Sequence, residues 1–118
     1  MTNHIRRIGA GARMSKAVVH GETIYTAGQV ADQTKGASVA DQTREILGLI
    51  DEILAEAGSE KAKILSATIY LSDISTFAEM NSVWDVWLDK SNPPARATLE
   101  AKLVAPEYKV EIAVIAAR

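Results

Sequence analysis

The segment that most constrains the fold is the last apolar stretch, residues 109–116, because it is apolar on both faces. Alternation places Val110, Ile112, Val114 and Ala116 on one face of a strand, and Glu111, Ala113 and Ile115 on the other. Such a strand belongs in a sheet that is covered on both sides. Glu111 is then a carboxylate among apolar neighbours, a costly placement that requires a partner, a hydrogen bond or a function.

A second charged residue in an unexpected place, Arg96, follows the double proline Pro93-Pro94. The prolines favour extended geometry, so we expect the chain to continue as a strand. In that strand the side chains of Arg96, Thr98 and Glu100 point one way, and those of Ala97, Leu99, Ala101 and Leu103 the other. We predict that Arg96 and Glu111 belong to one pocket.

Near the N-terminus the pattern predicts a hairpin, with strands at residues 17–20 and 23–30 and a turn at Gly21-Glu22. Gly28 lies at the end of the second strand. It either lets a backbone or a ligand approach closely or marks a bulge or strand end. The basic segment that precedes the hairpin faintly resembles a transit peptide.

The first predicted helix begins at Ser38, with Asp41 completing a capping-box pattern, and ends at Gly58. Its apolar stripe is Thr43, Ile46, Ile50, Ile53, Leu54 and Ala57. The other face carries Gln42, Arg44, Glu45, Glu52 and Glu56, which we interpret as solvated. A strand follows at residues 64–71, with Leu65, Ala67, Ile69 and Leu71 on one face and Ser66, Thr68 and Tyr70 on the other.

The second predicted helix begins near Ser75 or Thr76, with Glu79 placed to complete a capping box, and ends at about Leu88. Its stripe is Phe77, Met80, Val83, Trp84, Trp87 and Leu88, which we interpret as core rather than as a base-stacking platform. Asn81 lies off this stripe. It is either an exposed polar residue or one that reaches toward a neighbouring site.

The resulting order, β-β-α-β-α-β-β, predicts one α+β domain over residues 1–118, a two-layer structure with both helices on one face of a mixed sheet. The opposite sheet face includes Thr68, Tyr70, Ala113 and Ile115. Because this face is too apolar to lie bare, we expect other copies of the chain to cover it in a closed oligomer.

Composition excludes several classes of function. The chain has no cysteine, which rules out disulfides, thiolate zinc sites and a cysteine nucleophile. A formal charge of −2 argues against a general nucleic-acid binder. His4 and His20 are too isolated for a metal pair. Without a membrane span or a signal-peptide pattern, we expect a cytoplasmic protein that needs no metal or organic cofactor.

Four motifs together resemble the RidA/YjgF family of imine and enamine deaminases over nearly the whole chain. They are Pro94-Ala95-Arg96-Ala97-Thr98, Lys109-Val110-Glu111-Ile112, Thr26-Ala27-Gly28-Gln29 and Phe77-Ala78-Glu79-Met80-Asn81, in the family's order and spacing. The resemblance implies a chorismate-mutase-like fold and a homotrimer with a pocket at each subunit interface.

The resemblance also implies roles for individual residues. The family's arginine, here Arg96, holds the substrate carboxylate, and its glutamate, here Glu111, positions a water. The counterpart of Asn81 lines the pocket and that of Gly28 offers its backbone there. Thr98 stands where many members have a small or sulfur-bearing residue.

A departure from the family pattern lies in the N-terminal loop. Deaminase members carry a tyrosine there, whereas this chain has Met14 within Arg13-Met14-Ser15. Two functions therefore remain open. One is hydrolysis of 2-imino acids, with Arg96 as carboxylate anchor and Glu111 as the group that activates water. The other is non-catalytic binding of a small carboxylate, by a sensor or regulatory protein.

A structural interpretation of the two charges also remains open. Arg96 and Glu111 would then pair with each other or with surface charges, and would stabilise the sheet or a subunit interface.

Overall fold

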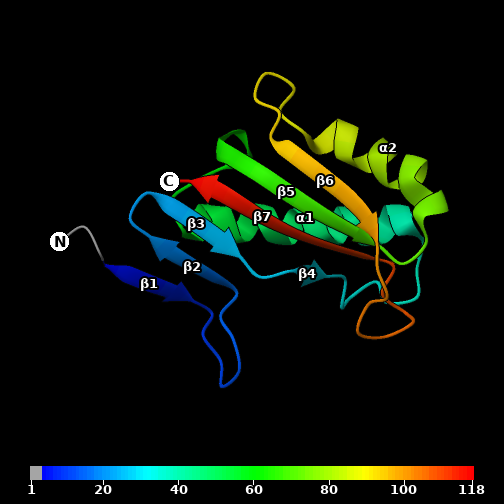
Figure 1. Cartoon of the computed structure of the whole chain (residues 1–118), viewed down its shortest axis with the longest axis horizontal. Helices are drawn as coiled ribbons and strands as arrows, with labels where there is room; N and C mark the ends of the chain where they lie inside the picture. Colours follow the sequence, from blue (N-terminus) through cyan, green and yellow to red (C-terminus); the bar gives the residue numbers. More distant parts are fainter. Residues whose placement is uncertain (1–3) are drawn as a thin grey trace.

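A mixed sheet carries two helices on one of its faces in the computed structural model, which describes residues 4–118. Figure 1 shows the strands crossing in front of the longer helix. The strands are β1 (Ile5–Ile8), β2 (Ala17–His20), β3 (Thr23–Thr26), β4 (Gln29–Val30), β5 (Ile64–Leu71), β6 (Ala95–Glu100) and β7 (Val110–Ala117). The helices are α1 (Val39–Glu56) and α2 (Phe77–Trp87), with short 3-10 helices at Lys61–Lys63 and Ile74–Thr76.

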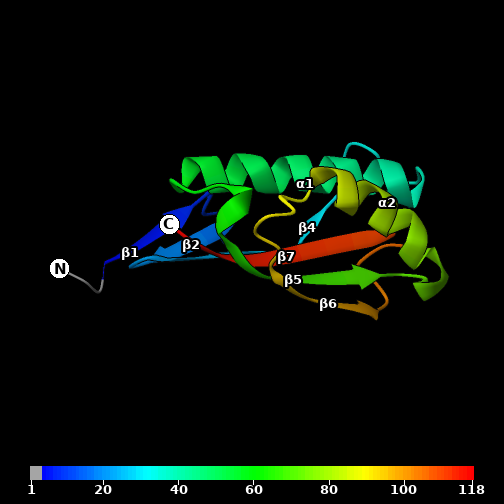
Figure 2. The same ribbon diagram turned by 90° about the horizontal axis from the view of Figure 1, so that it is seen from above.

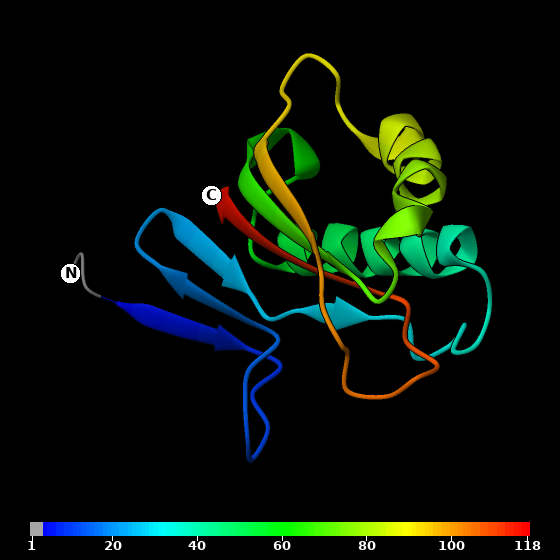
Figure 3. The same cartoon turned by 45° about the vertical axis from the view of Figure 1, so that its right-hand side comes forward.

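The strand order across the sheet is β1-β2-β3-β7-β5-β6, with β4 also paired to β7. All pairings are antiparallel except that of β5 with β6, which is parallel and is connected through α2. β7 therefore lies in the middle of the sheet and β6 at its edge. Figure 3 shows α2 at one side of the molecule and the β1–β3 strands at the other.

Both helices lie on the same side of the sheet, as Figure 2 shows edge-on. The predicted two-layer α+β arrangement is confirmed. Alternate residues of β7, from Val110 to Ala116, are buried beneath the helices together with Ile24, Ile69 and Leu71. We call the opposite side the open face. It carries Tyr25 and Leu99, residues that are 45% and 42% exposed, and no part of residues 4–118 covers it.

The first helix begins and ends as predicted. The hydroxyl of Ser38 accepts a hydrogen bond from the Asp41 backbone N–H at 3.1 Å, and Gly58 follows the helix with a φ of 82°. The helix is less solvated than predicted. Gln42 is fully buried and Glu45 is partly buried, because both side chains bind the backbone of neighbouring loops.

The second helix differs from the prediction at two residues. Glu79 does not cap its own helix; its carboxylate accepts the Ala40 N–H at 2.9 Å and thereby caps α1. Phe77 is not a core residue, since 42% of its surface is exposed. The rest of the predicted stripe is buried or packed against the core.

Three predictions about strands were wrong. The chain has an additional strand, β1, because residues 5–8 pair along the edge of β2. The predicted strand 23–30 is divided into β3 and β4 at Ala27-Gly28, where the Thr26 hydroxyl takes the hydrogen bond of the Val114 N–H at 2.9 Å. A bulge between Ile64 and Ser66 exposes Leu65 and buries Ile64 instead.

Within residues 4–118, none of the helices is long and apolar enough to cross a bilayer.

Candidate functional site

Arg96 projects from the edge strand β6 toward the helix layer. Its strand neighbour in the register is Ala67, which is buried beneath the helices. The guanidinium donates a hydrogen bond from Nη1 to the Asn81 side-chain oxygen of α2 at 2.8 Å. The structure therefore supports the second interpretation of Asn81, as a polar residue that reaches a neighbouring group.

Two aromatic rings of α2 lie against the same guanidinium. The central carbon of Arg96 is 5.6 Å from the ring centre of Phe77 and 5.2 Å from that of Trp84, both within cation–π range. Phe77, Asn81 and Trp84 are spaced by four and three residues, so they share one face of the helix. The sequence pattern predicts Phe77 and Trp84 as core residues only, and their spacing to Asn81 is the signal that indicates the shared face.

The partly buried cation forms no ion pair with any group of residues 4–118. The single ion pair among residues 4–118 joins Arg44 to Asp41. A guanidinium has five N–H donors, and the hydrogen bond to Asn81 uses one of them. Arg96 is therefore available to bind a carboxylate with two parallel hydrogen bonds.

Thr98 lies two residues further along β6, on the same face as Arg96. Its neighbour in the register is the buried Ile69. The hydroxyl oxygen is buried and has no hydrogen-bond partner within the described residues. Thr98 therefore lies beside Arg96 in the same half of the predicted site, as the strand alternation indicated.

Glu111 lies on the open face of β7, in contact with Gly28. An added Cβ on Gly28 would overlap Oε2 of Glu111, so the carboxylate can keep its present position only beside a glycine. Glu111 is partly buried and forms no ion pair among residues 4–118. Gly28 lies at the break between β3 and β4, as the strand-end interpretation expects, and the group that approaches it closely is the Glu111 side chain rather than a backbone or a ligand.

Met14 lies in the loop between β1 and β2, and 59% of its surface is exposed. Met14 and Gly28 line a cavity of about 440 Å³ beside α1, together with Leu49 and Ile53. Neither Arg96 nor Glu111 lines this cavity. The structure thus brings Met14 near Gly28 but not near Arg96.

The predicted site is divided in two within one chain. Glu111 of β7 pairs with Tyr70 of β5, which in turn pairs with Leu99 of β6. Arg96 of β6 pairs with Ala67 of β5, which in turn pairs with Val114 of β7. Val114 and Glu111 are three residues apart on β7 and therefore point to opposite faces. Arg96 and Glu111 are thus on opposite sides of the sheet, and the prediction that they share a pocket does not hold within one chain.

The division also excludes an ion pair between Arg96 and Glu111 inside the chain. We define two half-sites. The arginine half-site consists of Arg96, Asn81 and Thr98 on the helix side of the β6 edge. The glutamate half-site consists of Glu111 and Gly28 on the open face. A common pocket requires half-sites from two copies.

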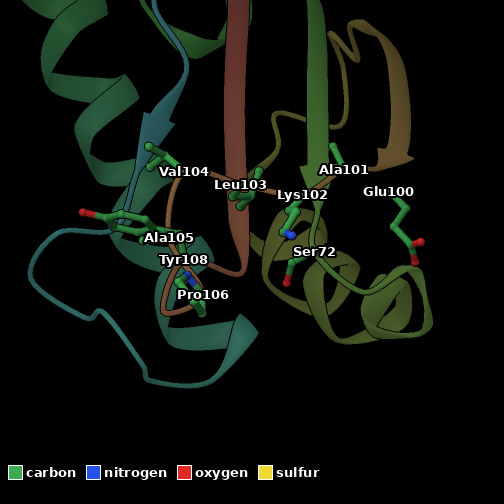
Figure 4. Close-up of a pocket in the computed structure, with 9 residues that line it drawn as sticks. All are labelled: Ser72, Glu100, Ala101, Lys102, Leu103, Val104, Ala105, Pro106 and Tyr108. Atoms are coloured by element: carbon green, nitrogen blue, oxygen red, sulfur yellow. The ribbon is translucent and has the colours of Figure 1, made fainter.

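A separate cavity of about 480 Å³ lies under the 101–109 loop, as Figure 4 shows. Its lining comes from that loop and from the ends of β5 and β6, and includes Ser72, Lys102 and Tyr108.

The Tyr108 hydroxyl donates to Asp32, which raises the pKa of the phenol. Hydrogen bonds from Ser75 lower the pKa of Asp73. Neither titrating group belongs to the two half-sites.

Comparisons with known proteins cover nearly the whole chain. A family model described as Endoribonuclease L-PSP matches residues 4–118. A RutC family protein of Haemophilus influenzae is 48% identical over 95% of this chain and 97% of its own. The RutC family protein YoaB of Escherichia coli is 43% identical over 96% of this chain and 97% of its own.

The fold comparison gives the same family. The crystal structure of a YjgF-family protein of Neisseria meningitidis matches with a TM-score of 0.96 and 42% identity, over 100% of this chain and 98% of that one. Sequence and fold therefore place the chain in the YjgF/RutC family.

Proposed function

We propose that the protein hydrolyses reactive 2-imino acids and their enamine tautomers to 2-keto acids and ammonia. The observation that carries the proposal is the unpaired, partly buried guanidinium of Arg96. It is held by Asn81, and no carboxylate in the described part of the chain lies within ion-pairing distance of it. A guanidinium in that state is suited to a small carboxylate, because it offers parallel N–H donors and a full charge.

The chemistry assigned to the glutamate half-site is addition of water. Glu111 accepts a proton from water as the oxygen attacks C2 of the imine, and a carbinolamine forms. The carboxylic acid gives this proton to the imine nitrogen, which completes the carbinolamine. The Glu111 carboxylate then takes the hydroxyl proton of the carbinolamine and passes it to nitrogen, so that the C=O bond forms as the C–N bond breaks and ammonia leaves with the 2-keto acid. A single carboxylate serves these proton transfers, and no oxidant or metal enters the balance.

The proposed reaction requires that two copies of the chain form each site. The open face presents apolar side chains such as Tyr25 and Leu99, and burial against another copy would remove them from water. A closed ring of copies would bring the arginine half-site of one protomer to the glutamate half-site of the next. We propose the trimer that the family resemblance implies.

Release of keto acid and ammonia tests the proposal directly. Imino acids are generated in situ by an amino-acid oxidase, with catalase to remove peroxide, and the amino acid is varied. We expect the protein to accelerate release and the Arg96→Ala variant to lose the acceleration. Arg44→Ala is the matched control, because Arg44 is an exposed arginine already paired with Asp41. Equal rates with and without the protein, for every amino acid, would contradict the proposal.

A binding module without catalysis is the second candidate, and Met14 favours it. The deaminases that the chain resembles carry a tyrosine in that loop, whereas Met14 has no proton to donate. In this case the protein would still bind small carboxylates through Arg96. Binding of a 2-keto acid without acceleration of imine hydrolysis would identify this function.

Ribonuclease activity, which the description of the family model names, is not what we propose. The formal charge of −2 disfavours binding to a phosphate backbone. Cleavage of single-stranded RNA by the protein, lost in the Glu111→Gln variant, would point to ribonuclease activity instead.

A further inference from the structure

We propose that Phe77 and Trp84 act as positioning residues for Arg96 and thereby set the affinity of the site for its carboxylate. This inference rests on the proposed function, because it assumes that Arg96 binds the substrate. It concerns the two rings, which touch the guanidinium and belong to neither half-site. Together with Asn81 they form a cradle on one face of α2, and we call these three residues the arginine cradle.

An arginine side chain is long, and fixing it in one rotamer carries an entropic cost at the moment of binding. The cradle removes much of that cost in advance. Ring centres at 5.6 Å and 5.2 Å attract the guanidinium, and the 2.8 Å hydrogen bond to Asn81 fixes its orientation. The remaining N–H donors are left for the ligand.

Phe77 gives the clearest sign that the cradle is more than packing. The residue is 42% exposed, whereas Met80, Val83 and Trp84 of the same helix are buried. Phe77 does not belong to the buried core cluster, and its ring lies over the Arg96 guanidinium. Trp84 is 4% exposed and serves both the core and the cradle.

The test uses Phe77→Leu, which removes the aromatic ring and keeps an apolar side chain. The probe is pyruvate, a 2-keto acid of the product class. We expect the Kd for pyruvate to rise by roughly three- to thirty-fold, the range that a cation–π contact spans. In turnover the KM should rise and kcat should stay, because Arg96 holds the carboxylate in both the ground and the transition state. Phe77→Tyr retains a ring and should restore the parent values.

Val86→Leu is the matched control, because Val86 lies on the same helix, is 86% exposed and is not part of the arginine cradle. A second readout reports on Arg96 itself. In proton–nitrogen NMR spectra the side-chain Nε–H of Arg96 should show a ring-current shift, and Phe77→Leu should reduce it.

The outcomes separate the two proposals. If Phe77→Leu binds pyruvate as tightly as the parent does, the positioning role is overturned while the carboxylate site stands. If the Nε–H shift changes but the Kd and KM do not, the cradle exists without governing affinity, and the inference is again overturned. If the parent binds no pyruvate and hydrolyses no imine, both proposals fail.

Discussion

Arg96 and Glu111 project from opposite faces of one sheet. β5 lies between their strands, which are therefore roughly 10 Å apart across the sheet. Arg96 faces α2 and Glu111 faces the open side next to Gly28. Two charged groups that one chain keeps apart can act on the same small molecule only if a second chain supplies one of them.

Substitutions of the two charged residues should have different effects. Glu111→Gln keeps the shape of the side chain but removes the proton acceptor, so turnover should fall by about 10²- to 10⁴-fold while binding of pyruvate is kept. Arg96→Ala should weaken binding of pyruvate by roughly ten- to a hundred-fold and reduce kcat/KM as well. Calorimetry and the keto-acid assay measure the two quantities separately. Equal loss of binding in both variants, with no turnover in the parent, would support the binding module instead.

A methyl group on Gly28 should disable the glutamate half-site. In Gly28→Ala the new Cβ would overlap Oε2 of Glu111, so the carboxylate must move. We expect kcat to fall by at least about ten-fold, since misplacing a reacting group by about 1 Å costs up to a hundred-fold.

Gly48→Ala is the control for that substitution. Gly48 lies inside α1 and an added Cβ there meets nothing within 4 Å. It should raise the free energy of unfolding by about 0.5–1 kcal/mol and leave kcat unchanged. A Gly28→Ala variant with the parent's kcat would show that the position of Glu111 does not matter for turnover.

The buried side chain of Gln42 should stabilise the 101–109 loop through its hydrogen bonds. It is fully buried, donates to the Glu107 carbonyl at 2.9 Å and accepts from the Lys109 N–H at 2.9 Å. Gln42→Leu leaves these loop groups unpaired, so the free energy of unfolding should fall by about 1–3 kcal/mol. Urea unfolding measures the change, with the exposed Gln33→Leu as the control. Equal stability of the two variants would mean that the loop is held by other contacts.

Local patterns in the sequence predicted much of the fold because they depend on neighbouring residues only. Ser38 and Gly58 mark the ends of α1 because capping and a positive φ are set within one turn. Alternation likewise assigned Arg96 and Thr98 to one face of their strand and Glu111 to one face of β7. Each assignment agrees with the observed burial.

Long-range contacts account for the errors. Glu79 has the spacing of a capping residue for its own helix, but the nearby N-terminus of α1 offers an unpaired N–H and binds it instead. Gln42 is polar and yet buried, because a loop 65 residues away supplies its partners. The bulge at Leu65 shifts the alternation by one residue, which no local pattern indicates.

The sequence patterns did not predict that Arg96 and Glu111 lie on opposite faces of the sheet, for a related reason. Alternation defines two faces for each strand but does not say which face of one strand continues which face of another. That relation follows from the pairing of Thr98 with Ile69 and of Ile69 with Ile112, which puts the Arg96 face beneath the helices and Glu111 opposite. The family resemblance implies a pocket at a subunit interface. The strand register explains why such an interface is needed, because it places Arg96 and Glu111 on opposite faces of the sheet within one chain.

Complementation between inactive variants tests the central claim most directly. Arg96→Ala and Glu111→Gln proteins are each unfolded, mixed in equal amounts and refolded together. If each site takes Arg96 from one copy and Glu111 from another, random assembly into any closed ring restores roughly a quarter of the sites. We expect the mixture to regain about that share of parental imine hydrolysis, while each variant refolded alone stays inactive. A mixture as inactive as its components, when the parent refolded in the same way is active, would contradict a site shared between two copies.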